Sequence, residues 1–206
     1  MSADEIHPLV ATTALSVAAR SGVTTVILVE GVSDQVALET LARRRGRDLE
    51  AEKVMVVPMG GATTVRHFLS LFGPTGLDLR LSGLCDAGEE SDFRRGLEQA
   101  GLGVALDRAG MEDLGFFVCV ADLEEELIRA LGEAMVIELI QSEGDLDSFR
   151  IFQSQPAQRG RAVEPQLRRF MGTRSGRKIH YAQVLVDALD LTRVPRALEG
   201  ALAHTA

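Results

Sequence analysis

Aromatic residues are scarce in this sequence: they make up 4% of its 206 residues, and tryptophan is absent. A surface that binds single-stranded nucleic acid by stacking needs several exposed rings, so the composition disfavours that class of binding protein. Hydrophobic residues nevertheless make up 46% of the chain. We therefore expect an ordinary buried core, in one sizeable domain or in one domain with a helical appendage.

Long apolar runs are absent as well. No segment of the sequence is long enough to span a bilayer. The N-terminal stretch MSADEIHPLV carries acidic residues where a secretory signal would begin with basic ones. We therefore expect a cytoplasmic protein that makes no membrane contact.

Cysteine and the common nucleotide-binding patterns are also sparse. Cys85 and Cys119 each lie in an apolar run without clustered histidines, which predicts buried thiols and no zinc site. The segment GTRSGRK at residues 172–178 lacks the spacing of a P-loop, and no Gly-x-Gly-x-x-Gly follows the first apolar run. These absences disfavour a nucleotide-hydrolysing site and a dinucleotide cofactor.

The charges are unevenly distributed. The net charge is −8, which by itself disfavours a nucleic-acid partner. Residues 158–196, however, hold nine basic and three acidic side chains, a net +6, so the rest of the chain carries −14. Such a segment suits a protein that holds a polyanion beside a cation-binding pocket. A solvated helix surface is the plainer explanation of a basic run taken alone, and both interpretations stay open.

Four short apolar runs predict strands, at residues 23–29, 54–58, 79–85 and 115–121. The first and last are almost continuously apolar, which is typical of strands buried on both faces of a parallel sheet. Segments with helical spacing lie between them, at residues 34–45, 63–72 and 91–100, the last with Ser91 as its expected N-cap. This alternation predicts an α/β fold, with a four-stranded parallel sheet flanked by helices.

The remainder of the chain is expected to be helical. One amphipathic helix precedes the sheet at residues 8–20. The helices expected after the last strand lie at residues 124–131, 133–142, 163–171, 179–189 and 195–204, with a loop that contains Gln153 to Gly160 before the third. We therefore expect an N-terminal helix at residues 1–22, an α/β domain at 23–132 and a helical extension with the basic patch at 133–206.

Acidic residues follow three of the four predicted strands. Glu30 follows the first strand, with Asp34 one helical turn further on, Asp86 follows the third, and Asp122 and Glu124 follow the fourth. The carboxyl ends of adjacent parallel strands lie about 5 Å apart, and ligands bind beyond them. Several carboxylates gathered there would repel one another unless a divalent cation neutralised them, and oxygen ligands favour Mg²⁺ or Mn²⁺.

Each of these acids also has a purely structural explanation. Asp34 or Asp86 alone would be read as the cap of a helix, and Asp122 with Glu124 could simply favour a helix N-terminus. Glu30 fits that explanation least, because glutamate is a poor N-cap. The metal hypothesis therefore depends on the acids converging.

The motifs EGVSD (30–34), PMGGA (58–62), LCDAGEE (84–90) and ADLEEELIRALG (121–132) resemble a TOPRIM domain. The closest likeness is to the TOPRIM domain of OLD (overcoming lysogenization defect) nucleases, over roughly residues 20–200. This resemblance implies a TOPRIM fold, which is Rossmann-like, and two-metal hydrolysis of a phosphodiester in DNA with Mg²⁺ or Mn²⁺.

The resemblance also implies roles for particular residues. One metal site would use Glu30, Asp34, Asp122 and Glu124. A second would use Asp86 with Glu89 or Glu90, and Lys178 would stabilise charge on the phosphate.

Two features depart from the family pattern. The usual Asp-x-Asp after the third strand is here Asp86-Ala87-Gly88, so the second carboxylate is missing. OLD nucleases also carry an ATPase domain ahead of the TOPRIM domain. We therefore expect a stand-alone form, acting by itself or with a separate ATPase subunit.

The leading functional hypothesis is a Mg²⁺- or Mn²⁺-dependent endonuclease. The alternative is a non-catalytic subunit of TOPRIM fold that binds DNA or an ATPase. A third hypothesis is a phosphatase or phosphotransferase acting on small phosphate esters. A homodimer is a further expectation, because the helix at residues 8–20 would gain a partner surface from it.

Overall fold

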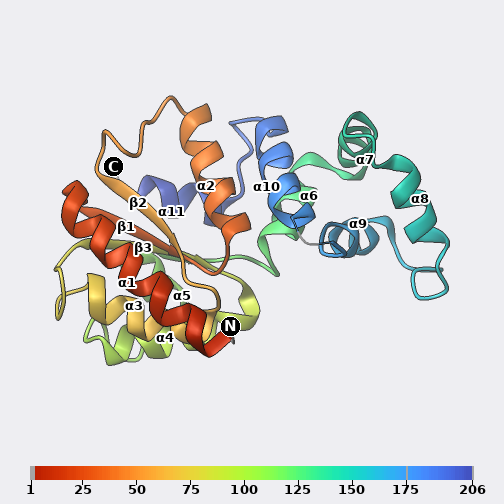
Figure 1. Cartoon of the computed structure of the whole chain (residues 1–206). Helices are drawn as coiled ribbons and strands as arrows, with labels where there is room; N and C mark the ends of the chain where they lie inside the picture. The colour runs from red at the N-terminus through yellow and green to blue at the C-terminus, as the bar shows by residue number, and fades with distance from the viewer. Residues whose placement is uncertain (1–2, 175, 206) are drawn as a thin grey trace.

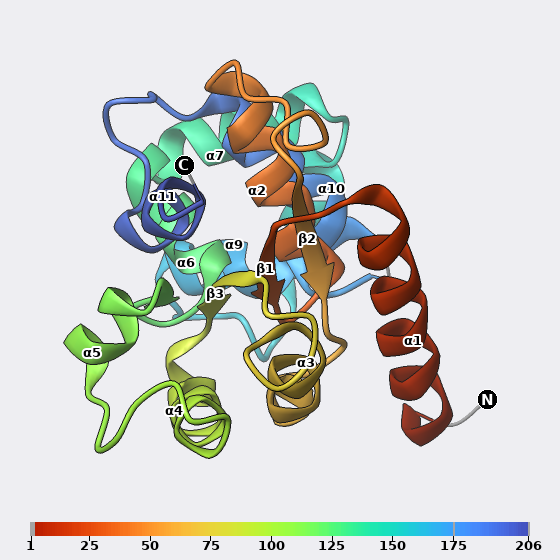
Figure 2. The same cartoon turned by 90° about the vertical axis from the view of Figure 1, so that its left-hand side faces the viewer.

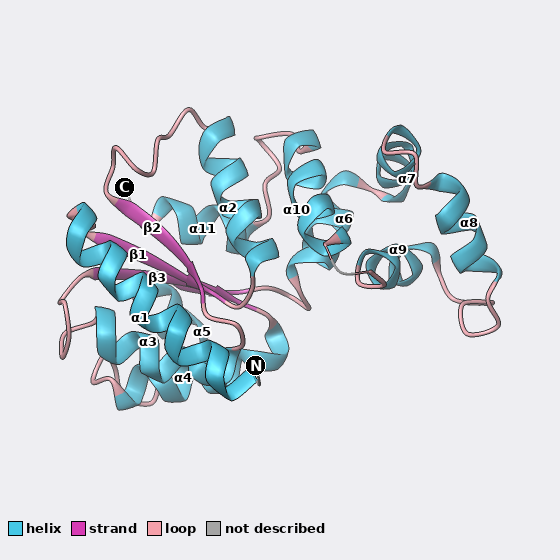
Figure 3. Cartoon of the chain, viewed as in Figure 1, coloured by secondary structure: helices cyan, strands magenta, loops and turns pink. Residues whose placement is uncertain are grey.

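The computed structural model describes residues 3–174 and 176–205 of the chain. Its centre is a four-stranded parallel sheet in the order β2-β1-β3-β4, which Figure 3 shows in magenta. The strands are β1 (Thr25–Val29), β2 (Val54–Pro58), β3 (Arg80–Cys85) and β4 (Phe116–Val118). The predicted α/β class and parallel sheet are confirmed.

Helices cover both faces of the sheet (Figure 2). All five residues of β1 are buried, and they alternate between two hydrophobic clusters: Ile27 and Val29 belong to one, Val26 and Leu28 to the other. One face packs against α1 (Ala3–Ser21), α3 (Val65–Phe72), α4 (Glu90–Gln99) and α5 (Arg108–Asp113). The other packs against α2 (Val32–Arg44), α10 (Arg177–Ala188) and α11 (Arg196–Ala203). Burial on both faces explains why the sequence of β1 is apolar throughout.

A helical lobe extends beyond the carboxyl ends of the strands (Figure 1). It consists of α6 (Leu123–Leu131), α7 (Glu133–Ser142), α8 (Leu146–Ser154) and α9 (Val163–Met171). Aromatic packing stabilises the lobe: the ring centroids of Phe149 and Phe152 lie 5.1 and 5.7 Å from the ring centroid of Phe170. The lobe therefore lies next to the carboxyl ends of the strands, where the acidic residues were expected.

The last two helices return from the lobe to the sheet. α10 lies along α2, where the Arg44 guanidinium donates to the carbonyls of Val186 and Leu189, each at 2.7 Å. α11 covers β3 and β4, and the Ser82 hydroxyl donates to the Ala201 carbonyl at 2.9 Å. The predicted boundaries at residues 22 and 132 stay predictions.

Several local predictions differ from the structure. Ser91 is not an N-cap: a 3₁₀ turn, η2 (Ala87–Glu89), leads straight into α4, so Ser91 already lies in the first helical turn. The helices α5 and α8 were not predicted, and β4 is shorter than the apolar run that predicted it. Both cysteines are buried and free, as predicted. Among the described residues, no helix is both long and apolar enough to cross a membrane.

Candidate metal centre

The strand register brings three carboxylates together. Val29 pairs with Leu84, so Glu30 and Asp86 leave the sheet at the carboxyl ends of adjacent strands. Glu89 joins them from η2. One carboxylate oxygen from each of these three residues lies within 4.8 Å of the others. Three acidic oxygens at this separation form a site that could hold a divalent cation.

Glu89, one of the two candidates that the sequence left open beside Asp86, lies in this cluster. Glu90 points elsewhere, because it accepts from the Arg108 guanidinium at 2.8 Å. The Oε2 atom of Glu89 is buried and has no hydrogen-bond partner among the described residues. A buried carboxylate oxygen without a donor is costly in a native structure, and a role in binding a cation is one of its ordinary explanations. The donor set therefore fits a hard cation such as Mg²⁺ or Mn²⁺.

Steric crowding does not explain why position 88 is glycine where the family has its second aspartate. A Cβ atom added to Gly88 would meet no heavy atom within 4 Å. Space for an Asp-x-Asp side chain is thus present, and Glu89 supplies a carboxylate from the next position instead.

Asp34 lies one helical turn beyond Glu30, in α2. Its Oδ2 atom accepts from the Gly31 amide at 2.9 Å, which closes the first turn of the helix. Burial raises the pKa of Asp34, and the Gly31 hydrogen bond and the Lys178 charge oppose that rise. Asp34 is therefore not the N-cap, which is Gly31; it is the third residue of the helix and accepts from the N-cap amide. Its charge also contributes to the raised pKa of Asp86.

Asp122 and Glu124 lie at the start of α6, where their side chains pair with residues of α9 and α10. Asp122 Oδ1 accepts from the Glu125 amide at 2.8 Å and caps the helix, whereas its Oδ2 accepts from the Arg168 guanidinium of α9. Glu124 Oε2 lies 3.2 Å from Lys178 Nζ. Both oxygens of Asp122 therefore have protein partners already, and its role as a metal ligand stays a prediction.

The site perturbs the titration of its own residues. Burial, followed by a carboxyl–carboxyl hydrogen bond with Glu89 and by the charge of Glu89, raises the pKa of Glu30 to about 7. Burial, followed by the charges of Asp34 and Asp122, raises the pKa of Asp86 to about 7. The smaller, charge-based part of each shift reflects repulsion between the neighbouring carboxylates, which a bound cation would relieve.

Lys178 is the cationic member of the site. Burial lowers its pKa, but the carboxylates of Glu124, Asp34 and Asp86 outweigh that effect and raise it. Lys178 is therefore charged at neutral pH, as a group that stabilises negative charge on a phosphate must be. Burial also raises the pKa of both cysteine thiols, so neither is a ready nucleophile.

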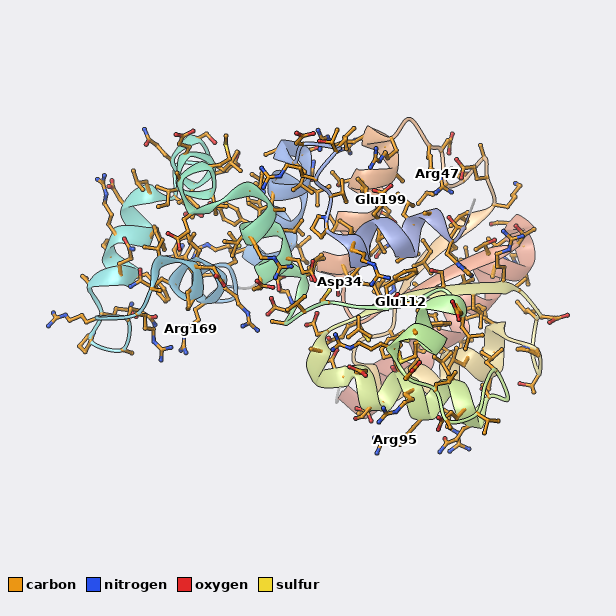
Figure 4. The ribbon with its side chains drawn as sticks, turned by 180° about the vertical axis from the view of Figure 1, so that it is seen from behind. Asp34, Arg47, Arg95, Glu112, Arg169 and Glu199 are labelled. Atoms are coloured by element: carbon orange, nitrogen blue, oxygen red, sulfur yellow. The ribbon has the colours of Figure 1, made fainter. Side chains whose placement is uncertain are left out.

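The sequence did not predict the ion pair between Arg168 and Asp122. Arg168 belonged to the predicted basic segment, but no local pattern indicated a partner 46 residues away. Figure 4 shows Asp34 where the α/β part and the lobe meet.

Residues 23–87 match the family model described as the overcoming lysogenization defect protein-like TOPRIM domain. The fold resembles the C-terminal region of the Burkholderia pseudomallei OLD protein, with a TM-score of 0.67 and 21% identity over 89% of this chain and 96% of that one. Two structures of the C-terminal region of the Xanthomonas campestris pv. campestris OLD protein are also similar. One, phased with platinum, has a TM-score of 0.70 and 24% identity over 89% of this chain and 92% of that one. The other, phased with iodine, has a TM-score of 0.68 and 26% identity over 89% and 94%. Comparison with curated proteins gives no match.

Proposed function

We propose that this chain, whose residues 23–87 match the OLD-like TOPRIM domain, is a Mg²⁺- or Mn²⁺-dependent nuclease that hydrolyses phosphodiester bonds in DNA. The observation that carries the proposal is the oxygen cluster of Glu30, Asp86 and Glu89, with its unpartnered buried oxygen on Glu89.

The residues divide into two groups around the proposed reaction centre. Glu30, Asp86 and Glu89 would hold one ion at the strand ends. Asp34 and Glu124 would contribute to a second, on the side facing the lobe, with Asp122 holding the start of α6 in place. Bound divalent ions would supply an activated water and charge stabilisation at the leaving oxygen.

Lys178 would act on the substrate directly. Its ammonium group lies at the border of the acidic site, 3.2 Å from Glu124 Oε2. Once cations neutralise the carboxylates, Lys178 would be available to a non-bridging phosphate oxygen and would stabilise the charge that develops there.

The test is cleavage of supercoiled plasmid in Mg²⁺ and in Mn²⁺. We expect the wild type to nick and linearise the plasmid, and Glu30→Gln and Asp86→Asn to lose at least about 100-fold in rate, a loss typical of removing one electrostatic contributor. Glu90→Gln is the matched control, because this neighbouring acid pairs with Arg108 outside the cluster. Equal cleavage by the wild type and both cluster variants would rule out this site as the catalytic centre.

Gly88 favours a second candidate, a non-catalytic subunit of the same fold that binds DNA. The family's second aspartate is absent at this position, which would leave one metal site incomplete. Calorimetric titration with Mn²⁺ separates the two candidates, since the nuclease requires binding at millimolar concentrations or below. DNA binding without metal binding or cleavage would favour the non-catalytic subunit.

A further inference from the structure

A groove with a small excess of basic side chains lies where α6, α9 and α10 meet, beside the candidate metal centre. It has a volume of about 470 Å³, and its charged lining residues are the bases Arg161, Arg168, Arg169 and Lys178 and the acids Asp122, Glu124 and Glu164. We call it the α9 groove. The cluster of Glu30, Asp86 and Glu89 is not part of this lining, so the groove adjoins the candidate metal centre through Glu124 and Lys178 and continues onto α9.

The three arginines of the α9 groove differ in what they contact. Arg168 is paired with Asp122. Arg161 and Arg169 are exposed, and among the described residues no carboxylate lies within ion-pair distance of either. Arg161 uses only its Nε, which donates to the Ala157 carbonyl at 2.9 Å. Two guanidinium groups are therefore available to a ligand, while the third is already used to join α9 to α6.

Some arginines of this chain pair with carboxylates, as Arg43, Arg45 and Arg129 do, whereas Arg161 and Arg169 have no such partner within the described part of the chain and lie next to the acidic site. An unpaired arginine costs little at an exposed position, but two of them beside an acidic site provide a local attraction for a polyanion. The planar fork of the guanidinium suits phosphate oxygens in particular.

We propose that the α9 groove holds the sugar-phosphate backbone of DNA next to the scissile bond, with Arg161 and Arg169 as its phosphate contacts. Arg168 stays on Asp122 and positions α9 instead of contacting the substrate. The inference rests on the proposed function for the identity of the polyanion. It adds that the substrate is a polynucleotide which reaches from the strand ends onto α9, so a small phosphate ester would leave the groove empty.

Equilibrium binding of a labelled duplex oligonucleotide, followed by anisotropy in Ca²⁺ over a series of salt concentrations, tests this proposal. Each lost phosphate contact makes the slope of log K against log salt shallower by about 0.9. We expect a reduction of about that size for Arg161→Gln and for Arg169→Gln, and of about 1.8 for the double variant. Arg150→Gln is the matched control: it lies on α8 in the same lobe, is exposed, and has only a 3.9 Å contact with Asp147.

Two outcomes would overturn the assignment. One is a double variant that binds the duplex with the affinity and salt slope of the wild type. The other is loss of Mn²⁺ binding in the double variant, measured by calorimetry, which would mean that the arginines support the metal centre and not the substrate. Both readouts are independent of cleavage. If the protein cleaves no DNA but its DNA binding still shows the arginine-dependent salt slope, the proposed nuclease activity is contradicted and the proposed DNA-binding role of the α9 groove is supported.

Discussion

Among individual residues, Glu30 and Asp86 determine how the candidate metal centre responds to pH. Each has a pKa raised to about 7 in the folded protein, against ordinary values of 4.5 and 3.8. The folded chain holds these two protons more tightly than the unfolded chain does, so the metal-free protein should lose stability as pH rises from about 4 to about 7. Metal binding has the opposite trend, because the ligands must be deprotonated first.

The measurement is thermal unfolding between pH 5 and pH 8, in EDTA and in Mn²⁺. We expect the melting temperature in EDTA to fall as pH rises, and the increase caused by Mn²⁺ to grow above about pH 7. The double variant Glu30→Gln, Asp86→Asn should show a flatter profile in EDTA and little response to Mn²⁺. An unchanged pH profile in that variant would show that other groups control the stability.

Glu89 provides a second residue-scale prediction. Glu89→Gln removes the charge from the unpartnered buried oxygen, so we expect Mn²⁺ affinity to fall by about tenfold or more, which corresponds to about 1.4 kcal/mol. Adding Gly88→Asp to this variant should recover much of the affinity, because that position has open space for a side chain. Calorimetry measures both changes, with Glu90→Gln as the control. Wild-type Mn²⁺ affinity in Glu89→Gln would show that Glu89 is not a ligand of the ion.

At the scale of helices and strands, Asp122 joins two helices. It caps α6 through Oδ1 and holds Arg168 of α9 through Oδ2. Asp122→Asn keeps a capping oxygen and should cost less than about 1 kcal/mol, because Arg168 is half exposed and such pairs contribute little. Asp122→Ala loses the cap as well and should cost about 1 kcal/mol more.

Denaturant unfolding measures these costs, and Mn²⁺ titration of the same variants tests what Asp122 does. We expect Asp122→Asn to bind Mn²⁺ with nearly wild-type affinity, whereas Glu30→Gln does not. A large loss of affinity in Asp122→Asn would instead make Asp122 a metal ligand, as the family resemblance implied.

The same elements show what the sequence could predict. Apolar runs predicted all four strands because a buried parallel strand needs apolar side chains on both faces, and strand ends predicted that Glu30 and Asp86 would meet. The pairing of Arg168 with Asp122 depends on how α9 packs against α6, and no local pattern encodes that packing. Helix α8 was missed for a similar reason: only its packing of Phe149 and Phe152 around Phe170 shows its buried face.

For the whole molecule, the packing of α10 and α11 determines how it unfolds. One hydrophobic cluster includes Ile27 of β1, Leu38 of α2, Phe170 of α9 and Leu202 of α11, so the sheet and the helical extension share a core. A fragment ending at residue 132 would expose one face of the sheet, and we expect it to be unable to fold by itself. The 206-residue chain should unfold in one transition.

The single tyrosine makes this prediction measurable. Tyr181 is buried in α10, and its hydroxyl donates to Asp145 Oδ2 at 3.2 Å, so near-ultraviolet circular dichroism of its ring reports on the extension alone. Far-ultraviolet circular dichroism reports on all helices and strands. We expect the two urea transitions to share a midpoint and slope, and Tyr181→Phe serves as the blank for the near-ultraviolet signal. A tyrosine transition that precedes the far-ultraviolet one would mean that the extension detaches first, and that the shared cluster contributes less than its burial indicates.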